Sequence, residues 1–147
     1  MPCVFCEIIQ GNIPAWKLYE DDRALAILDH RPVQQGHAVV LPKVHIDHFI
    51  DLDDDLAAHL LRIGKNLGLR IQETLKPKRI GYAIAGFGVP HAHLHVIPMS
   101  GDHDITSSHY AEVNDGILEF SGENVPIADD QEQAALVKLL GIPRDWR

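Results

Sequence analysis

The chain has 147 residues, of which 46% are hydrophobic and 23% charged, a composition typical of a globular domain with one core. Its formal net charge of -8 excludes general binding to nucleic acid polymers, because such binding depends on Lys and Arg neutralising phosphates. No apolar run approaches the roughly 20 residues of a membrane-spanning helix, and the N-terminal residues lack the basic and apolar regions of a signal peptide. We therefore expect a cytoplasmic protein with no membrane partner.

The first half of the chain predicts a short helical turn, three strands and a long helix. The turn covers roughly residues 4–10. Three apolar segments bounded by turn residues or proline predict strands at 17–20, 24–28 and 37–41. After a run of aspartates, apolar residues recur at helical spacing and predict a helix that ends near Leu75, before Pro77. Gly64 and Gly68 lie four residues apart on this helix, where they would allow close packing against a sheet.

The second half predicts two further strands and a C-terminal helix. The strands cover residues 80–85 and 91–99, and the helix covers residues 131–140, with Asp129 or Asp130 as its N-cap. The segment 101–126 is polar and predicts no element. Because the strands outnumber the helices and one long helix separates them, we expect an α+β fold with an antiparallel sheet of about five strands.

Three histidines alternate with apolar residues in the last predicted strand. Alternate residues of a strand share a face, so His91, His93 and His95 would form one row of imidazoles, while Ala92 and Leu94 point toward the core. The residues alone leave three interpretations open. The row could be a solvated sheet face, a metal site of imidazole ligands, or a catalytic site in which a neutral imidazole attacks phosphorus.

Two cysteines lie three positions apart at the N-terminus, at Cys3 and Cys6. This spacing is typical of zinc ligands and of redox dithiols, but the strand and helix context of a redox motif is missing. Tetrahedral zinc would need two further ligands, and with no other cysteine in the chain these would have to be histidines. The alternative is a pair of reduced, partly buried thiols.

The segment Gly88–Ile97 resembles the signature of the histidine-triad (HIT) family of nucleotide hydrolases and transferases. In that signature three histidines alternate with apolar residues and further apolar residues follow. Stretches at residues 5–9, 28–29, 36–37 and 42–45 are also similar to the family and occur in the expected order. The resemblance covers roughly residues 3–99 of a single domain spanning 1–147, so that residues 100–147 form a C-terminal extension.

The resemblance implies a covalent mechanism on a purine nucleotide. His93 matches the nucleophile that attacks the α-phosphorus and forms a nucleotidyl-histidine, which water then hydrolyses. His95 matches the residue that hydrogen-bonds the phosphate or leaving-group oxygen, and His91 supports the nucleophile. Asp29 matches the carboxylate that holds the ribose hydroxyls, although a turn residue after a strand would look the same. Four apolar residues would contact the base, or equally belong to the core: Ile27, Leu28, Phe5 and Ile8.

Some family members hold a structural zinc ion with residues that match Cys3, Cys6, His45 and His91, so zinc is the expected metal and no organic cofactor is expected. The family often carries Gln and then Ser, Thr or Glu where this chain has Phe87 and Gly88, and this difference leaves the leaving group undetermined. Both adenosine phosphoramidates and dinucleoside polyphosphates remain candidate substrates.

Family members are commonly homodimers with a sheet that continues across the subunit boundary, which makes a second copy the expected protein partner. In some relatives the C-terminus approaches the partner's active site, which directs attention to Trp146. A metal-dependent hydrolase with three histidine ligands and a nucleotide-binding protein without turnover are the alternative functions.

Overall fold

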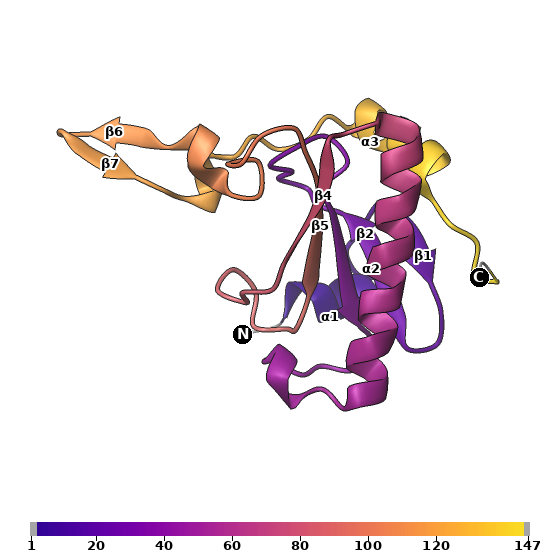
Figure 1. Ribbon diagram of the computed structural model, residues 1–147. Helices are drawn as coiled ribbons and strands as arrows, with labels where there is room; N and C mark the ends of the chain where they lie inside the picture. Colours follow the sequence, from indigo (N-terminus) through magenta and orange to yellow (C-terminus); the bar gives the residue numbers. More distant parts are fainter. Residues whose placement is uncertain (1–2, 146–147) are drawn as a thin grey trace.

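The computed structural model describes residues 3–145 and is organised around a five-stranded antiparallel sheet in the order β1-β2-β3-β5-β4 (Figure 1). The strands of this sheet are β1 (Lys17–Glu20), β2 (Ala24–Leu28), β3 (Ala38–Pro42), β4 (Arg79–Ala83) and β5 (Leu94–Met99). The helices are α1 (Val4–Ile9), α2 (Asp54–Leu75) and α3 (Asp130–Leu140), with short 3-10 turns η1 (Phe49–Asp51), η2 (Ser107–Tyr110) and η3 (Gly122–Asn124). The predicted α+β class is confirmed.

Helix α2 covers one face of the sheet. Asp53 caps it by accepting a 2.8 Å hydrogen bond from the backbone N–H of Leu56, and Lys76 ends it in the left-handed conformation, with a φ of 53°. Its buried stripe packs on the alternate residues of β2, β3 and β5 that face it, together with α3. None of the helices within residues 3–145 combines the length and hydropathy needed to cross a membrane.

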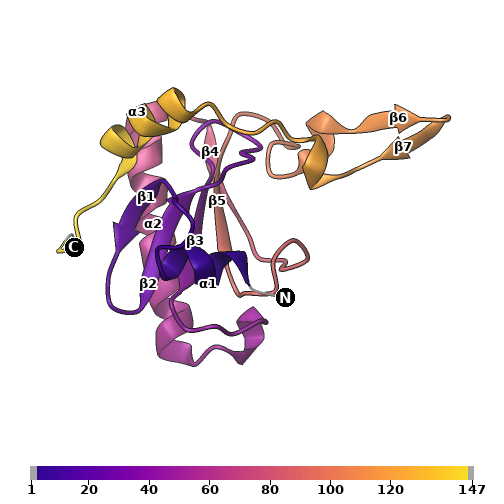
Figure 2. The ribbon, with the colours of Figure 1, turned by 180° about the vertical axis from the view of Figure 1, so that it is seen from behind.

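The opposite face of the sheet is covered near its centre by the short helix α1 (Figure 2). Phe5 and Ile8 of α1 pack with Leu25 and Ile27 of β2 and with β3. The N-terminal helix thus lies on the face toward which the odd-numbered residues of β5 point. This arrangement places Cys3, at the N-cap of α1, close to the start of β5.

The last strand of the sheet starts at Leu94, three residues later than predicted. The pairing of β3 with β5 ends at Val40 of β3, which lies opposite Leu94. Strand β3 itself ends at Pro42, which has no N–H to donate. The Ala92 N–H instead donates to the carbonyl of Ile46 at 2.7 Å. The histidine row predicted as one continuous strand is therefore an irregular segment that leads into a strand.

Residues 101–126, for which the sequence predicted no element, contain a second, two-stranded sheet formed by β6 (Glu112–Asn114) and β7 (Ile117–Glu119). Asp115 and Gly116 connect the strands with φ angles of 51° and 79°, the positive values of a two-residue hairpin turn. The Asp-Gly pair is a strong hairpin signal, but flanking strands of three residues are too short to show an alternating hydrophobic pattern in the sequence.

We predict that Gly64→Ala destabilises the protein although it improves intrinsic helix propensity. A methyl group at this position would lie 2.7 Å from a side-chain carbon of Leu94, which is 1% exposed and has no room to move. We expect the free energy of unfolding to fall by about 1–2 kcal/mol, since overpacking outweighs the propensity gain. Urea denaturation measures the change. Gly122→Ala is the control, because a methyl there meets nothing within 4 Å; equal stability of both variants would contradict the prediction.

Candidate active site

The three predicted histidines lie together but have different surroundings. His91 is 0% exposed and His93 is 5% exposed, whereas His95 is partly accessible. The rings of His93 and His95 lie 4.9 Å apart between centroids. His91 instead points toward the N-terminal cysteines, so only His93 and His95 are available as a pair.

His93 is held in one tautomer by the backbone. Its Nδ1 lies 2.6 Å from the carbonyl oxygen of His91, and because a carbonyl can only accept, Nδ1 must carry the hydrogen. In the neutral ring Nε2 then keeps its lone pair, which is the form that a nucleophile needs. Phe5 packs edge-on against this ring with 5.1 Å between centroids and fixes its orientation.

His95 is oriented by His37, a residue to which the sequence assigned no role. His37 is 4% exposed, and its Nδ1 accepts a 3.2 Å hydrogen bond from the Val33 N–H. Its Nε2 therefore carries the hydrogen and donates to Nδ1 of His95 at 2.8 Å. By the same reasoning Nε2 of His95 carries a hydrogen, and it can donate to a phosphate or leaving-group oxygen. The sequence signal for this role was that His37 is a histidine at the start of a predicted strand that is otherwise apolar.

Burial keeps both rings of this pair neutral. Desolvation, together with the charge that His93 can carry, lowers the pKa of His37 to about 4. Desolvation likewise lowers the pKa of His95 to about 4, aided by His37 and His93 and opposed by Asp29. The hydrogen-bond chain from Val33 to His95 therefore persists through the neutral pH range.

Asp29 follows β2 and lies on the same side as His95. One carboxylate oxygen accepts a 2.9 Å hydrogen bond from the Arg31 N–H, and the other lies 3.6 Å from Nε2 of His37. The carboxylate is about one-fifth exposed, so part of it remains available to a ligand.

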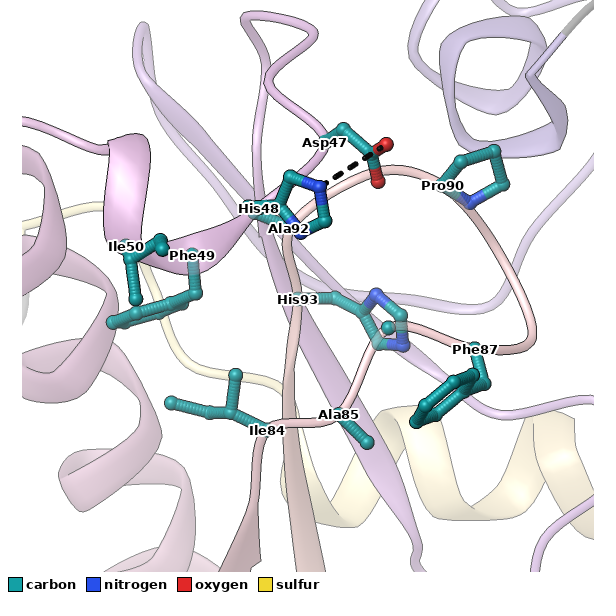
Figure 3. A pocket seen from close by; sticks show the side chains of 11 residues that line it. Asp47, His48, Phe49, Ile50, Ile84, Ala85, Phe87, Pro90, Ala92 and His93 are labelled. Carbon is teal, nitrogen blue, oxygen red and sulfur yellow. Dashed lines mark ion pairs between the residues drawn. The ribbon is translucent and has the colours of Figure 1, made fainter.

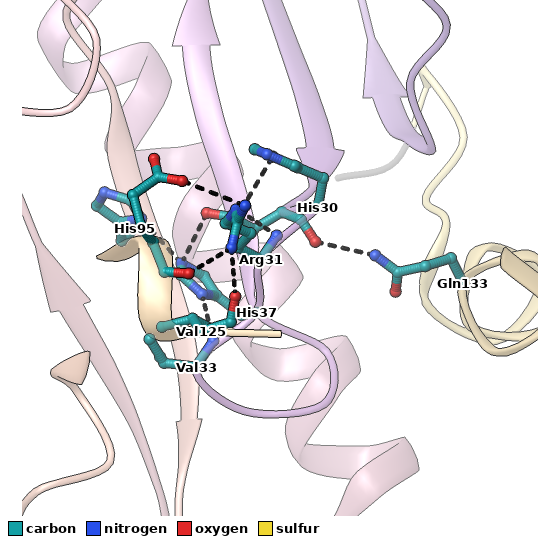
Figure 4. A network of polar contacts seen from close by, with 9 residues as sticks. His30, Arg31, Val33, His37, His95, Val125 and Gln133 are labelled. Carbon is teal, nitrogen blue, oxygen red and sulfur yellow. Dashed lines mark hydrogen bonds and ion pairs between the residues drawn. The ribbon is translucent and has the colours of Figure 1, made fainter. Parts of the chain in front are cut away.

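The C-terminal extension holds the loop that carries Asp29 (Figure 4). The Arg31 guanidinium donates to the carbonyls of Glu123 and Val125 at 2.7 and 2.8 Å. The Gln133 side chain donates to the Asp29 carbonyl at 2.9 Å. Residues outside the family-like part of the sequence thus position the predicted ribose carboxylate.

The four apolar residues predicted to contact a base are divided between the two faces of the sheet. Phe5, Ile8 and Ile27 form one cluster on the face of α1 and His93, where all three are buried. Leu28 belongs to the core beneath α2. Successive residues of a strand point to opposite faces, and for Leu28 this placement agrees with the alternative interpretation of a core residue.

The predicted metal ligands converge at the N-terminus of α1. The described residues include one group of four ligand atoms, from Cys3, Cys6, His45 and His91, that all lie within 4.8 Å of one another. Nδ1 of His91 lies 3.4 and 3.6 Å from the sulfurs of Cys3 and Cys6, and 3.2 Å from Nδ1 of His45. Zinc bonds of about 2.0–2.3 Å in a tetrahedron place ligand atoms about 3.3–3.8 Å apart.

The protonation states of these ligand residues are also compatible with a bound metal ion. Nε2 of His91 donates to the Pro42 carbonyl at 2.8 Å, which leaves the Nδ1 lone pair directed at the cysteines. Burial lowers the pKa of His91 and so favours its neutral form. Desolvation and the neighbouring Cys3 raise the pKa of the Cys6 thiol, so metal binding would release a proton there. Two cysteines and two histidines match a closed zinc site.

A second group of possible ligands, formed by Asp29, His37 and His95, has hydrogen bonds that do not suit a metal. Nε2 of His37 carries a hydrogen because Nδ1 accepts from Val33, so it has no lone pair for an ion. Neither of the two ligand groups within residues 3–145 contains His93. The geometry therefore gives no support to one ion bound by all three triad histidines.

A pocket of about 520 Å³ opens beside His93 (Figure 3). Its lining is mainly apolar and comes from residues 47–50 and 84–87, with Pro90 and Ala92. Phe87, which replaces a polar residue of the family pattern, is 99% exposed at this pocket. The charged and titratable lining groups are Asp47, His48 and His93, so the pocket has no Lys or Arg to bind a polyphosphate.

Comparisons with known proteins agree with this fold and site. A family model described as the HIT domain matches residues 10–102. An uncharacterized HIT-like protein of Mycoplasma genitalium is 40% identical over 101 residues, covering 65% of this chain and 72% of the relative. The crystal structure of a hypothetical histidine triad nucleotide-binding protein from Sulfolobus tokodaii strain7 has a TM-score of 0.73 at 28% identity, covering 94% of this chain and 89% of that chain.

A Zn-bound histidine triad family protein from Mycobacterium smegmatis has a TM-score of 0.69 at 29% identity, covering 95% of this chain and 91% of that chain. The α+β fold is thus the fold of these structurally similar histidine-triad proteins. The chain belongs to the HIT, or histidine-triad, family.

We predict that His37→Gln flattens the acid dependence of stability. The folded-state pKa values of His37 and His95 lie at about 4, below the usual value of 6.5. The unfolded chain therefore takes up protons first as the pH falls, and stability present above pH 6.5 is lost progressively toward pH 4. Removing one such group should reduce the loss between pH 7 and pH 4.5 by about 2 kcal/mol.

Urea denaturation across this pH range measures the effect. Val33→Ala is the matched control, because it perturbs the same loop without removing a titratable group. Any metal lost in acid affects wild type and both variants alike, so the difference between the variants isolates His37. Parallel stability curves for His37→Gln and wild type would contradict the prediction.

Proposed function

We propose that the protein is a nucleotide phosphoramidase or dinucleoside polyphosphate hydrolase that forms a covalent nucleotidyl-histidine at His93. The single observation that carries this proposal is the 2.6 Å hydrogen bond from Nδ1 of His93 to the His91 carbonyl, which leaves Nε2 with its lone pair. The lone pair forms a bond to the α-phosphorus as the bond from phosphorus to the leaving group breaks. Water then attacks phosphorus, the N–P bond breaks, and the nucleoside monophosphate is released.

His95 supplies the second catalytic group in this proposal. Its Nε2–H is fixed by the chain through His37 and donates to the phosphate or to the departing oxygen or nitrogen. His91 acts through its carbonyl, which positions the nucleophile. Asp29 accepts hydrogen bonds from the ribose hydroxyls. A purine base packs against the apolar surface formed by Ile27, Phe5 and Ile8.

The phosphoramidase alternative has more support than the polyphosphate hydrolase. A departing polyphosphate carries several negative charges that must be neutralised by cations. The pocket beside His93 contains Asp47 and no Lys or Arg. A leaving group that is an amine, neutral or apolar suits this lining better than a second nucleotide phosphate does.

We propose zinc as a structural ion held by Cys3, Cys6, His45 and His91. Four protein ligands close a tetrahedron and leave no position for water, so a bound ion would stabilise the N-terminus rather than activate a nucleophile. The ion would hold helix α1 against the end of β3 and keep the His91 carbonyl in place for His93.

A homodimer is the proposed assembly. Strand β4 is hydrogen-bonded to β5 on one side only, so its outer edge is open for a second copy of the chain. Antiparallel pairing of two β4 strands would give an isologous interface and one continuous sheet.

The covalent mechanism predicts that His93→Ala abolishes labelling by an adenosine phosphoramidate that carries a labelled phosphorus. Wild type should retain an acid-labile phosphohistidine-type label after rapid denaturation, whereas the variant should retain none and lose at least about 10³-fold in turnover. His109→Ala, at a half-exposed ring outside the site, is the control and should label as wild type does.

Each alternative function would give a different result in this labelling experiment. Equal loss of activity for His91, His93 and His95 variants, restored by added metal, would favour the metal-dependent hydrolase. Nucleotide binding without label or turnover in wild type would favour a binding protein, and either result would reject the covalent mechanism.

Metal analysis tests the structural zinc separately. We expect about one zinc ion per chain in wild type and a large loss in Cys3→Ser, together with a lower melting temperature. His48→Ala should keep its zinc because His48 is not among the four ligands. Equal zinc content in wild type and Cys3→Ser would contradict the proposed zinc site, but it would not contradict the proposed role of His93 as the nucleophile.

A further inference from the structure

The hairpin of β6 and β7 extends away from the rest of the molecule as an arm, residues 112–120 (Figures 1 and 2). Every residue of this arm is exposed, and its large apolar side chains are 55–67% exposed: Val113, Ile117, Leu118 and Phe120. None of them belongs to a core cluster of the described chain. A two-stranded hairpin is marginally stable in water without further packing, so such an arm indicates a missing contact surface.

The base of the arm, by contrast, is firmly attached. Tyr110 and Ile105 pack with Ile97 of β5, Val33 and Val125. The arm leaves the body near Met99, which pairs with Arg79 at the first residue of the edge strand β4. In Figure 1 it extends on the side of β4 and β5, opposite to β1 and the C-terminus. The arm therefore projects toward the place that a second copy paired on β4 would occupy.

A second apolar surface lies at the other end of β4. Ile84 follows the strand, and together with Ile50 and Phe87 it borders the pocket beside His93. These three side chains are 45%, 90% and 99% exposed. We call these three residues the pocket rim. The arm of a chain starts near the Arg79 end of β4, whereas its own pocket rim lies beyond the Ala83 end.

Antiparallel pairing of two β4 strands would bring these surfaces together, because it places the Arg79 end of one copy beside the Ala83 end of the other. From residue 110 to residue 115 an extended strand spans about 17 Å. The partner's β4 and β5 would lie only about 5 and 10 Å beyond the edge, since neighbouring strands are about 4.8 Å apart. The arm is therefore long enough to reach the partner's pocket rim.

Charge supports the same pairing. Basic residues precede and open β4, at Lys76, Lys78 and Arg79, and all three are exposed. The segment beside the Ala83 end contains Asp47, and the adjoining residues 51–55 contain four more aspartates. Antiparallel pairing brings the basic end of each copy to the acidic end of the other, whereas parallel pairing would place like charges together.

We propose that residues 112–120 form an exchanged arm, whose apolar side chains pack on the pocket rim of a second copy of this chain and cover the pocket beside His93. This inference rests on the proposed homodimer and extends it, because the active site of each copy is completed by the other. A covered pocket provides an apolar surface for the leaving group. By symmetry each arm and each rim is buried, which removes both exposed apolar surfaces.

Photo-crosslinking tests the arm directly. A benzoylphenylalanine at Ile117 is irradiated in a mixture of isotopically heavy and light chains, and crosslinked peptides are identified by mass spectrometry. We expect heavy–light crosslinks from the arm to residues 47–50 or 84–90. The matched control is the same probe at Leu139, which is 48% exposed on α3 and should give no such crosslink. A probe at Val113 replaces the first if that variant does not fold.

Analytical ultracentrifugation of the same proteins separates the arm from the dimer. A dimer with arm-to-rim crosslinks between chains supports the proposal. A dimer whose arm crosslinks elsewhere, or not at all, overturns the arm assignment and leaves the β4 interface standing. A monomer at assay concentration overturns both, while the labelling of His93 remains an independent measurement.

Discussion

The departure of the chain from the β-ladder at His91 is the constraint on which the rest of the site depends. Pro42 ends the neighbouring strand β3, and its carbonyl accepts a hydrogen bond from Nε2 of His91. This hydrogen bond to the backbone fixes the orientation of the His91 ring. The other ring nitrogen is then directed at Cys3 and Cys6, and the His91 carbonyl is left free of the ladder to accept from His93. One residue thereby joins the proposed metal site to the nucleophile without contacting the substrate.

Much of the fold and of the candidate site could be predicted from the sequence, because the patterns that indicate them are local. Alternation of histidine with apolar residues correctly separated the core residues Ala92, Leu94 and Val96 from the site residues. The hydrophobic periodicity and the capping residues of the sequence predict β1, β2 and α2. Helix α3 is capped by Asp129, which was one of the two N-cap residues expected. Cys3, Cys6, His45 and His91 do meet, although only the family resemblance had connected them.

The parts that could not be predicted depend on contacts between distant segments. The start of β5 depends on where β3 ends. The role of His37 depends on its position just before β3, from which its side chain reaches His95 on the neighbouring strand β5. Leu28 could be either a base contact or a core residue, because the sequence does not say which face of β2 meets α2. The hydrogen bonds between the extension and the loop of Asp29 and Arg31 could not be predicted, since they connect residues about 90 to 105 positions apart.

These long-range contacts give the extension a consistent physical role. Its first part packs against β5 through Ile105 and Tyr110, and its later part holds the Asp29 loop through Arg31 and Gln133. Both attachments reach the loop of residues 29–33, through Arg31 and through the carbonyl of Val33. The exposed pocket rim, by contrast, has no cover within residues 3–145. A single chain therefore holds Asp29 and the histidines in place. It leaves open the part in which this chain departs from the family, at Phe87 and Gly88. If an apolar arm closes that side, an exposed phenylalanine at the rim is a packing residue rather than a lost polar contact, and the substitution and the arm explain each other.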